Sequence, residues 1–464
     1  MAVVLRNADF GLRILETPFG ALFGVSVFAL LIFWVCYPSH FLIADELAYF
    51  EQARAFSSGQ DGAVDYPAGT GLLAAFFIWL GGNKAVFWSS FLCWLAGTWA
   101  LSLALHKTGK PVGWALFPWL FIPALVFTRT LMSDMPSFAL AAFFGLLCTA
   151  FPPNRKVMFL AGGVGGLSVL FRETNFLWVL PFALSFVLRK KMAWRWFMAG
   201  FCIGLLPRLI SGWVLHQNPV YLRDPGIAFS WNVLPGNLLF YGLTLLVFLP
   251  GGLWFLWKTK HPWRAEIGIC AGLFLLVYGS YGYDALAKSG YKGILLQARF
   301  MLPLLPFFGL SAAWTPVRLS QKTAAVCSAL AILLFAGIQI TGRMYNDAQQ
   351  KISGALLKIP ARSQISFSPD ESRKYLNAMY GPSTILDGHA LSDRVLQSRN
   401  IWYAHLISRS ESADRVAKAR AAFSDFYTRF EGWKIDQIDQ VVLADGTNLY
   451  VWSAQKKDNN DEKR

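Results

Sequence analysis

Charged residues are scarce in this chain of 464 residues. Lys, Arg, Asp and Glu make up 15% of it, against roughly 25% in an ordinary soluble domain. This shortage excludes a typical soluble globular protein, because such a protein needs far more charge on its surface. Apolar residues fill the chain instead, with 55% hydrophobic and 16% aromatic residues.

Cysteine numbers six, and its distribution does not suggest a disulfide framework or a metal knuckle. The six cysteines lie in or beside apolar runs, so we interpret them as small packing residues. The sequence also has no Walker A loop, no dinucleotide-binding glycine motif, no GxSxG elbow and no histidine-rich motif. The chain therefore lacks any recognisable device for binding a nucleotide, and no metal ligand set is predicted.

Long apolar runs follow one another from residue 16 to residue 340 and predict a polytopic α-helical membrane protein. The run 67–82 has only about a dozen strongly apolar residues, which suits an interfacial or re-entrant helix better than a full span. We therefore predict about 11 transmembrane helices plus this interfacial helix. The spans are predicted near 17–37, 84–106, 111–127, 135–151, 157–171, 176–188, 196–215, 238–257, 265–284, 300–316 and 323–341.

Basic residues set the predicted orientation of this membrane part. With the N-terminus inside and 67–82 not crossing, the inside segments hold about twice as many Lys and Arg as the outside loops, as the positive-inside rule requires. The same rule explains the net charge of +15 without a nucleic-acid partner. Most acidic residues of the membrane part then lie outside, so the chemistry is expected on the outer face.

The composition changes at about Thr341 to a polar sequence of mixed charge. Strand-like runs (SQISF, STILDG, QVVLADGTNLYVWSA) alternate with helix-like ones (SDRVLQSRN, SADRVAKARAAFSDFYTRF). We predict a transmembrane module over 1–341, with its first outer loop over 38–83, and a small extracytoplasmic α/β domain over 342–464. The polar tail 455–464 is predicted to be disordered.

Two adjacent carboxylates, Asp45 and Glu46, lie near the start of a predicted helix just outside the first span. At helical spacing Asp45 shares a stripe with Tyr49, Ala53 and Phe56, so it is expected to face inward. An Asp is also favoured at a helix start, where it stabilises the free backbone amides. Such capping explains one acid, but it does not explain a carboxylate in an apolar stripe with a second one beside it.

Asp134 and several cations complete the candidates on the outer face. Asp134 precedes a span and has Pro136 two residues later, which is also an ordinary helix start. Arg299 lies at the mouth of a later span, in an outside loop with Lys288 and Lys292, against the positive-inside pattern. Its planar guanidinium suits a phosphate, and the alternative is snorkelling to lipid headgroups.

Three further charged residues lie on or near the same face. Arg172 and Glu173 form another outer turn, where the alternative is that they pair with each other. Arg208 lies deeper in a span, and a buried Arg needs a partner or an aqueous cavity.

In this order, these stretches resemble the GT-C class of membrane glycosyltransferases. The likeness is to the branch of the protein O-mannosyltransferases and the aminoarabinose transferases that modify lipid A. The chain departs from that branch at Pro67-Ala68-Gly69, where members often have Pro-Pro-Gly. The resembling stretches, between residues 44 and 310, are ADELAYFEQARAF, YPAGTGLL, TRTLMSDMPSFAL, LFRETNFLW and ARFMLPLLPFFGL.

The resemblance implies a sugar transfer with inversion at the outer face of a bacterial-type cytoplasmic membrane. The donor would be a polyprenyl-phosphate-linked sugar among the membrane lipids, and the acceptor a hydroxyl of a glycan, lipid or protein. The acidic residues of the branch fall on Asp45 and Glu46, with Asp45 as the expected base, and on Asp134, which would orient the acceptor or tune Asp45. Phosphate binding is expected from Arg299, Lys288, Lys292, Arg172 and Arg208, and substrate contacts from Tyr49, Tyr66, Arg129 and Glu173.

Three further points stay open at the level of the sequence. Some members of the wider class use a divalent cation, so magnesium or manganese is a candidate cofactor. A flippase or transporter of lipid-linked sugar would share the cationic groove without needing Asp45, although no internal repeat is visible. A polysaccharide polymerase or ligase would need a large outer loop with its own acid and base, and here the largest outside piece is C-terminal.

Overall fold

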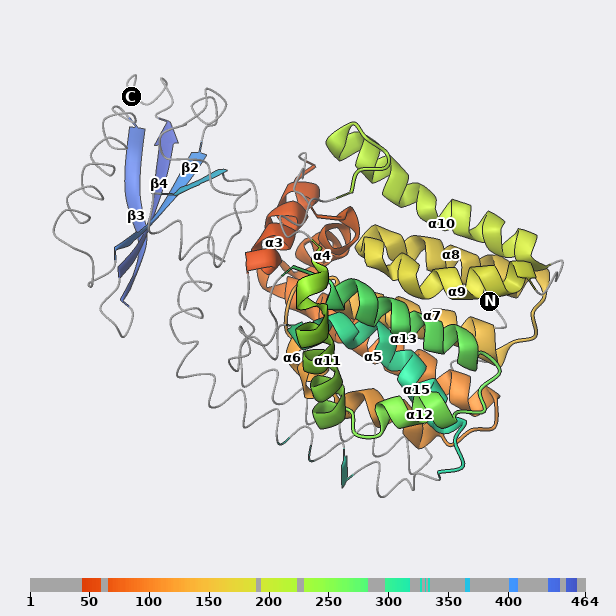
Figure 1. Cartoon of the computed structure of the whole chain (residues 1–464). Coiled ribbons are helices and arrows are strands. Elements are labelled where there is room, and N and C mark those ends of the chain that lie inside the picture. Colours follow the sequence, from red (N-terminus) through yellow and green to blue (C-terminus); the bar gives the residue numbers. More distant parts are fainter. Residues whose placement is uncertain are drawn as a thin grey trace. The chain divides into compact units, whose positions relative to one another are not determined.

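The structure, a computed structural model, describes residues 44–59, 66–188, 193–222, 229–282 and 297–317, the single residues 326, 327, 330 and 333, and four strands between residues 364 and 456 (Figure 1). The chain divides into two compact units. The first unit is formed by Met1–Pro38, Pro67–Thr70 and Trp88–Gln339. The second unit is formed by Ser39–Tyr66, Gly71–Phe87 and Ile340–Arg464.

Most helices of the first unit lie where the apolar runs predict them. Three helices of the described chain are long and apolar enough to cross a membrane, namely Phe87–Lys107, Trp194–His216 and Trp231–Phe248. The predicted span 17–37 lies outside the described residues, and so does nearly all of 323–341. The unbroken helices are α5 (Phe87–Lys107), α7 (Asp134–Ala150), α8 (Arg155–Phe171), α9 (Phe176–Leu188), α10 (Ala193–His216) and α13 (Arg264–Gly279).

Three predicted spans are not single α-helices. The span 111–127 consists of the 3-10 helix η2 (Val112–Leu120) and the short helix α6 (Ile122–Phe127). The span 238–257 is divided into α11 (Leu234–Phe248) and α12 (Gly252–Lys258). The span 300–316 begins as the 3-10 helix η5 (Arg299–Leu304) and continues as α15 (Leu305–Ala313).

Proline and glycine explain these breaks. Pro118 and Pro123 lie on either side of the first break, and Pro303 lies inside η5. These prolines disturb the helices because a proline removes a backbone hydrogen bond from a helix. Gly251 has a φ of 79°, a left-handed conformation that glycine adopts without steric cost. Short 3-10 turns also precede three of the helices: η1 (Asn83–Val86), η3 (Glu173–Asn175) and η4 (Trp231–Val233).

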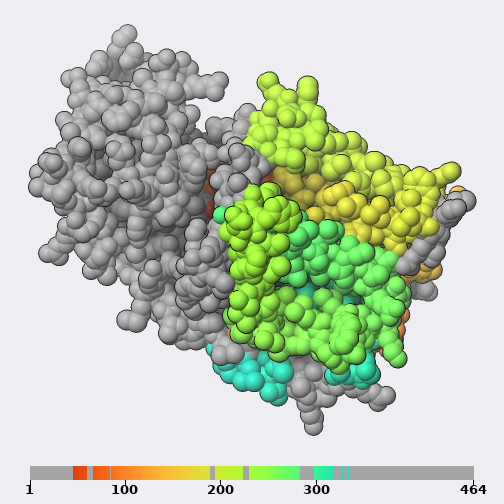
Figure 2. Space-filling view, viewed as in Figure 1, coloured from red at the N-terminus to blue at the C-terminus, as the bar shows by residue number. Residues whose placement is uncertain are grey.

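A seam of glycines joins α8 to α10. The run GGVGG predicts close helix packing, and the structure confirms it. A Cβ at Gly162 or Gly166 would overlap backbone oxygens of α10, and a Cβ at Gly200 or Gly204 would overlap backbone oxygens of α8. Only glycine allows the two backbones to approach this closely. The other side of α10 forms part of the surface of the first unit, where Ile203, Ile210 and Trp213 are exposed (Figure 2).

The second unit contains helix α3 (Ala44–Ser57), most of α4 (Ala68–Gly81) and a four-stranded sheet. With 14 residues, α4 is about 21 Å long, shorter than the ~30 Å hydrocarbon core. Its length therefore agrees with the interfacial helix predicted at 67–82. Phe76, Trp79 and Leu80 are exposed on it, as expected of a helix that faces lipid.

The sheet has the strand order β1-β2-β4-β3, with β1 parallel to β2 and the other pairs antiparallel. The runs SQISF and QVVLADGTNLYVWSA predict β1, β4 and part of β3, whereas β2 was not predicted. The run STILDG and the helix-like runs lie outside the described residues, apart from Asn400, which begins β2. The strands are β1 (Gln364–Phe367), β2 (Asn400–Ile407), β3 (Trp433–Val442) and β4 (Asn448–Lys456).

One prediction for the tail is wrong at its start. Gln455 and Lys456 are the last residues of β4, because they pair with Asn400 of β2 and with Trp433 and Lys434 of β3. Strand pairing on both sides thus outweighs the polar composition that predicted disorder from residue 455.

The membrane orientation is a prediction that cysteine labelling tests. On a background without the six native cysteines, single cysteines near Ser289 and in the C-terminal domain should react with a membrane-impermeant reagent on intact cells. A cysteine near Lys190 should react only after permeabilisation, because that basic loop is predicted to lie inside. Labelling of Lys190→Cys on intact cells would contradict this orientation and would indicate that 67–82 crosses the membrane.

Candidate functional site

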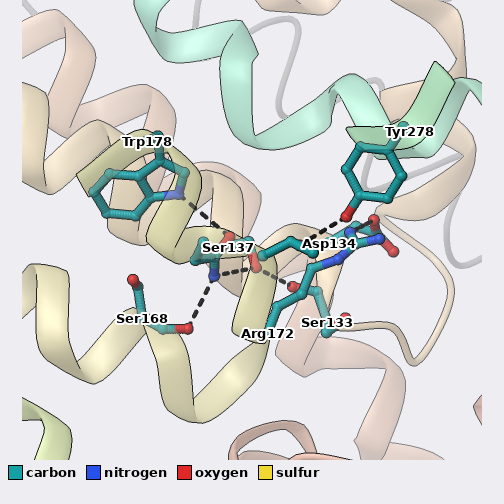
Figure 3. Close-up of polar contacts among 9 residues, drawn as sticks. Ser133, Asp134, Ser137, Ser168, Arg172, Trp178 and Tyr278 are labelled. Atoms are coloured by element: carbon teal, nitrogen blue, oxygen red, sulfur yellow. Dashed lines mark hydrogen bonds and ion pairs between the residues drawn. The ribbon is translucent and has the colours of Figure 1, made fainter. Parts of the chain in front are cut away.

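A buried ion pair between Asp134 and Arg172 lies in the first unit. Asp134 is the first residue of α7, and Arg172 follows α8 in an extended conformation. Arg172 Nη1 donates to Asp134 Oδ1 (Figure 3). The Asp134 side chain is 1% exposed and that of Arg172 is 14% exposed, so Arg172 is the partner that a ligand can reach. Asp134 Oδ2 has no hydrogen-bond partner among the described residues.

The helix-start interpretation of Asp134 accounts for part of what the structure shows. The helix does start at Asp134, as the ordinary helix-start interpretation requires. Its carboxylate, however, is engaged by a cation from another element, and a helix start alone does not explain such a pair.

Two aromatic rings lie beside the guanidinium of Arg172. Its Cζ atom is 5.4 Å from the ring centroid of Tyr278, near the end of α13, and 5.1 Å from that of Phe300 in η5. The two rings stack with centroids 4.4 Å apart. The hydroxyls of Tyr278 and Thr174 are hydrogen bonded at 2.7 Å. Arg172 thus lies among residues of α7, η3, α13 and η5, where cation–π contacts and the ion pair hold it.

Arg299 belongs to the same neighbourhood. The Arg299 Cζ atom lies 5.1 Å from the Phe300 ring centroid. The Arg172 Cζ atom lies at the same distance from that centroid, so the separation of the two Cζ atoms is at most twice that distance. Arg299 is half-buried. Two partly buried guanidinium groups in one neighbourhood can bind a phosphate from two sides.

A buried polar network fixes the turn that follows Arg172. Asn175 donates to the Ser137 hydroxyl at 2.8 Å and to the Ser168 carbonyl at 2.9 Å. Its own side-chain oxygen accepts from the Trp178 indole at 3.3 Å (Figure 3). The network ties η3 to both α7 and α8. A fully satisfied buried network of this kind rigidifies the backbone around it.

The alternative that Arg172 and Glu173 pair with each other is wrong for the described structure. Arg172 pairs with Asp134, whereas Glu173 accepts from Arg208 Nη2 at 3.0 Å. Arg208 Nη2 also donates to the Tyr221 carbonyl. The two neighbouring side chains diverge because Arg172 is extended and Glu173 begins a 3-10 turn. Arg208 has thus the partner that its depth in the span requires.

The acidic pair of the first outer loop belongs to the second unit. Tyr66 donates its hydroxyl to Asp45 Oδ1 at 2.6 Å, and its ring lies 4.7 Å from that of Tyr49. Gln52 donates to the Tyr66 carbonyl at 3.2 Å, which fixes the chain ahead of α4. Asp45, Tyr49 and Tyr66, three of the residues expected from the sequence, therefore lie together.

Burial on α3 differs from the stripe predicted for it. Tyr49 and Ala53 are buried as expected, but Asp45 is half-buried and Glu46 is fully buried. The stripe assumed one packed face, whereas α3 is buried on most sides, with Phe50 and Arg54 also enclosed. Asp45 is therefore the more accessible acid of the two.

One further acid of α3 has a shifted pKa. Burial raises the pKa of Glu51, and the neighbouring Arg54, whose Nη1 lies 3.3 Å from the Glu51 carboxylate, opposes that rise. This pair was not among the expected site residues.

Comparison with known proteins gives one informative likeness. No protein-family model and no curated protein matches the sequence. Among solved structures, the chain is similar to ArnT from Cupriavidus metallidurans, which was crystallised bound to undecaprenyl phosphate. The TM-score is 0.56 at 14% identity, over 93% of this chain and 98% of that one. The chain has the ArnT fold. The GT-C resemblance predicted from the sequence is thereby confirmed for the fold, and the chain is a helical membrane protein.

The remaining expected residues of this ArnT-like chain are only partly described. Lys288 and Lys292 lie outside the described residues. Arg129 is buried in the turn before α7. No three His, Cys, Asp or Glu side chains come close enough together to hold a metal ion in the part of the chain that the structure describes, and the divalent cation stays a prediction.

Several residues near Arg172 were not predicted from the sequence. Tyr278 is one of three tyrosines in VYGSYGYD, and nothing in that run indicates which of them faces Arg172. The position of Phe300 directly after Arg299 could have indicated that it lies near the candidate phosphate site. Asn175 had a signal as well, since a polar residue next to an apolar run often satisfies a buried partner.

Proposed function

We propose that this chain transfers a sugar from a polyprenyl-phosphate-linked donor to an acceptor hydroxyl, at the outer face of a bacterial-type cytoplasmic membrane. The observation that carries the proposal is the likeness in fold, over nearly the whole chain, to ArnT bound to undecaprenyl phosphate. The two arginines beside Phe300 add the charge that a lipid-linked phosphate needs.

The proposed reaction is a single displacement at the anomeric carbon. The acceptor oxygen forms a bond to that carbon, the bond from the carbon to the phosphate oxygen breaks, and the acceptor proton moves to a base. Negative charge grows on the leaving phosphate, so cations fixed beside it stabilise the transition state. Arg172 and Arg299 supply those cations, and attack opposite the phosphate inverts the configuration.

Asp45 is the proposed base. It is the accessible member of the acidic pair, and the Tyr66 hydroxyl orients its carboxylate. We assign Asp134 to holding Arg172 rather than to orienting the acceptor, because its side chain is fully enclosed and engaged with that cation.

Binding and turnover of a lipid-linked sugar test the proposal directly. Purified protein should bind undecaprenyl phosphate in native mass spectrometry. With undecaprenyl phosphate-linked sugars and a lipid or glycan acceptor, it should release free undecaprenyl phosphate. A wild-type protein that neither binds the lipid phosphate nor releases it from any such donor would contradict the proposed function.

Arg299→Ala is expected to weaken donor binding by about 10- to 100-fold. The reason is that a hydrogen bond to a charged group contributes roughly 1.5–3 kcal/mol. The measurement is the dissociation constant for undecaprenyl phosphate, and Arg299→Lys should restore only part of the affinity because an ammonium lacks the planar fork. Arg195→Ala is the matched control, since Arg195 is exposed on α10. An unchanged constant in Arg299→Ala would shift the phosphate contact to Arg172, Lys288 or Lys292.

A further inference from the structure

Two neighbouring residues of one turn form ion pairs with two different helices. Arg172 pairs with Asp134, and Glu173 pairs with Arg208 at 3.0 Å. The ion pairs connect the turn to α7 and to α10, in addition to the Asn175 contacts to α7 and α8. Arg208 is 6% exposed and lies about two turns before the C-terminal end of α10, a helix long and apolar enough to cross a membrane, where a charge is costly unless it is paired.

The sequence of α10 brings Arg208 to this turn. Gly200, Gly204, Arg208 and Gly212 follow one another at four-residue steps, which places them along one side of the helix. The first two glycines bring the backbone of α10 against α8. Arg208, one turn further along, reaches the turn that follows α8, where it meets Glu173.

The last glycine of this row makes room for the returning chain. A Cβ at Gly212 would lie 2.8 Å from the Asn218 carbonyl oxygen and 2.9 Å from that of Pro219. The chain that folds back here supplies the Tyr221 carbonyl, to which Arg208 donates, and the Tyr221 ring stacks on His216 at 3.8 Å. The guanidinium of Arg208 thus joins α10, the chain that follows it and Glu173.

We propose that Arg208 is a positioning residue for sugar transfer. Through Glu173 it fixes the turn that carries Arg172, and so fixes the Arg172 guanidinium against the leaving phosphate. This replaces the direct phosphate contact that the sequence predicts for Arg208. The inference rests on the proposed function and adds to it a residue that acts without touching the donor.

The physical consequence of losing this pair is a small displacement. Glu173 is 27% exposed, so water can solvate it once Arg208 is gone, and the fold survives. The turn then keeps the Asn175 contacts to α7 and α8 but loses its ion pair to α10. A misplacement of ~1 Å at a reacting centre can reduce a rate by about 100-fold, while the affinity for the donor depends less on such precision.

Arg208→Gln, Glu173→Gln and the double variant test this role. Each single variant should lower kcat by about 10- to 100-fold and leave the dissociation constant for undecaprenyl phosphate within about threefold. The double variant should be no slower than the worse single one, because both changes remove the same pair. Arg208→Lys, which keeps one charged donor, should recover part of kcat. Arg195→Gln, on the exposed side of the same helix, should match the wild type.

Each contrary outcome has a distinct meaning. A loss of undecaprenyl phosphate affinity in Arg208→Gln as large as that of Arg299→Ala would make Arg208 a phosphate ligand and overturn the positioning role. So would effects on kcat that multiply in the double variant, or a kcat equal to that of Arg195→Gln. If the wild type itself bound no undecaprenyl phosphate and transferred no sugar, the proposed function would fail and the inference with it.

Discussion

Asp45→Asn is expected to reduce sugar transfer by about 10²- to 10⁴-fold, the usual contribution of a general base. Asn keeps the size of Asp and can still accept a hydrogen bond from the Tyr66 hydroxyl, which lies 2.6 Å from Asp45 Oδ1. It cannot take the proton of the acceptor. The variant should therefore fold and bind undecaprenyl phosphate as the wild type does, and the transfer rate and the dissociation constant should be measured on the same preparation.

Glu46→Gln is the matched control for this experiment. Position 46 is turned by about 100° around the helix from position 45, and Glu46 is fully buried whereas Asp45 is half-buried. Its loss of transfer should be clearly smaller. A near wild-type rate in Asp45→Asn would mean that the base lies elsewhere and that Asp45 stabilises the start of α3, as the capping interpretation has it.

Arg172→Met is expected to abolish transfer and to lower the free energy of unfolding by about 3–5 kcal/mol, the usual cost of removing one partner of a buried ion pair. The cost is large because Asp134, 1% exposed, would keep its charge without the cation that balances it. Thermal unfolding in detergent, followed together with transfer, measures both effects.

A double variant separates stability from catalysis at this pair. Arg172→Gln combined with Asp134→Asn removes both charges at once, so most of the lost stability should return, because replacing a buried ion pair by neutral groups is often tolerated. Transfer should stay strongly reduced, since Arg299 alone of the two proposed cations would still face the phosphate. If the neutral pair restored transfer as well, Arg172 would have only a structural role.

The sequence predicts the positions of the helices better than it predicts the partners of the charged side chains. Apolar runs depend on each segment alone, so six helices begin within about three residues of the prediction, namely α5, α7, α8, α9, α10 and α13. Their ends agree within about one residue, apart from α13, which ends at Gly279 instead of residue 284. The GGVGG run likewise predicts close packing of α8, although it does not say that α10 is the partner. The number of spans stays a prediction, because two of the predicted spans lie largely outside the described residues.

The partners of the charged side chains depend on the tertiary fold, so the local sequence does not predict them. The neighbouring charges of Arg172 and Glu173 suggest a pair between themselves, but the backbone at the end of α8 turns them toward Asp134 and Arg208. The stripe through Asp45 predicted the burial of Tyr49 and Ala53, but it did not predict that of Glu46, for a related reason. Helical spacing describes faces of α3, but not how many of those faces are covered.

The glycine seam also bears on how this chain assembles in the lipid. Lipid tails are as apolar as the side chains of α10, so its docking on α8 depends on close packing rather than on escape from water. A bulky residue at Gly162 or Gly204 would not prevent the membrane insertion of α10, whose exposed side is apolar. The product would be a full-length, inserted protein in which α10 has drifted away from α8. Such a protein would be expressed and targeted to the membrane normally, but it would have lost the contact between Arg208 and Glu173.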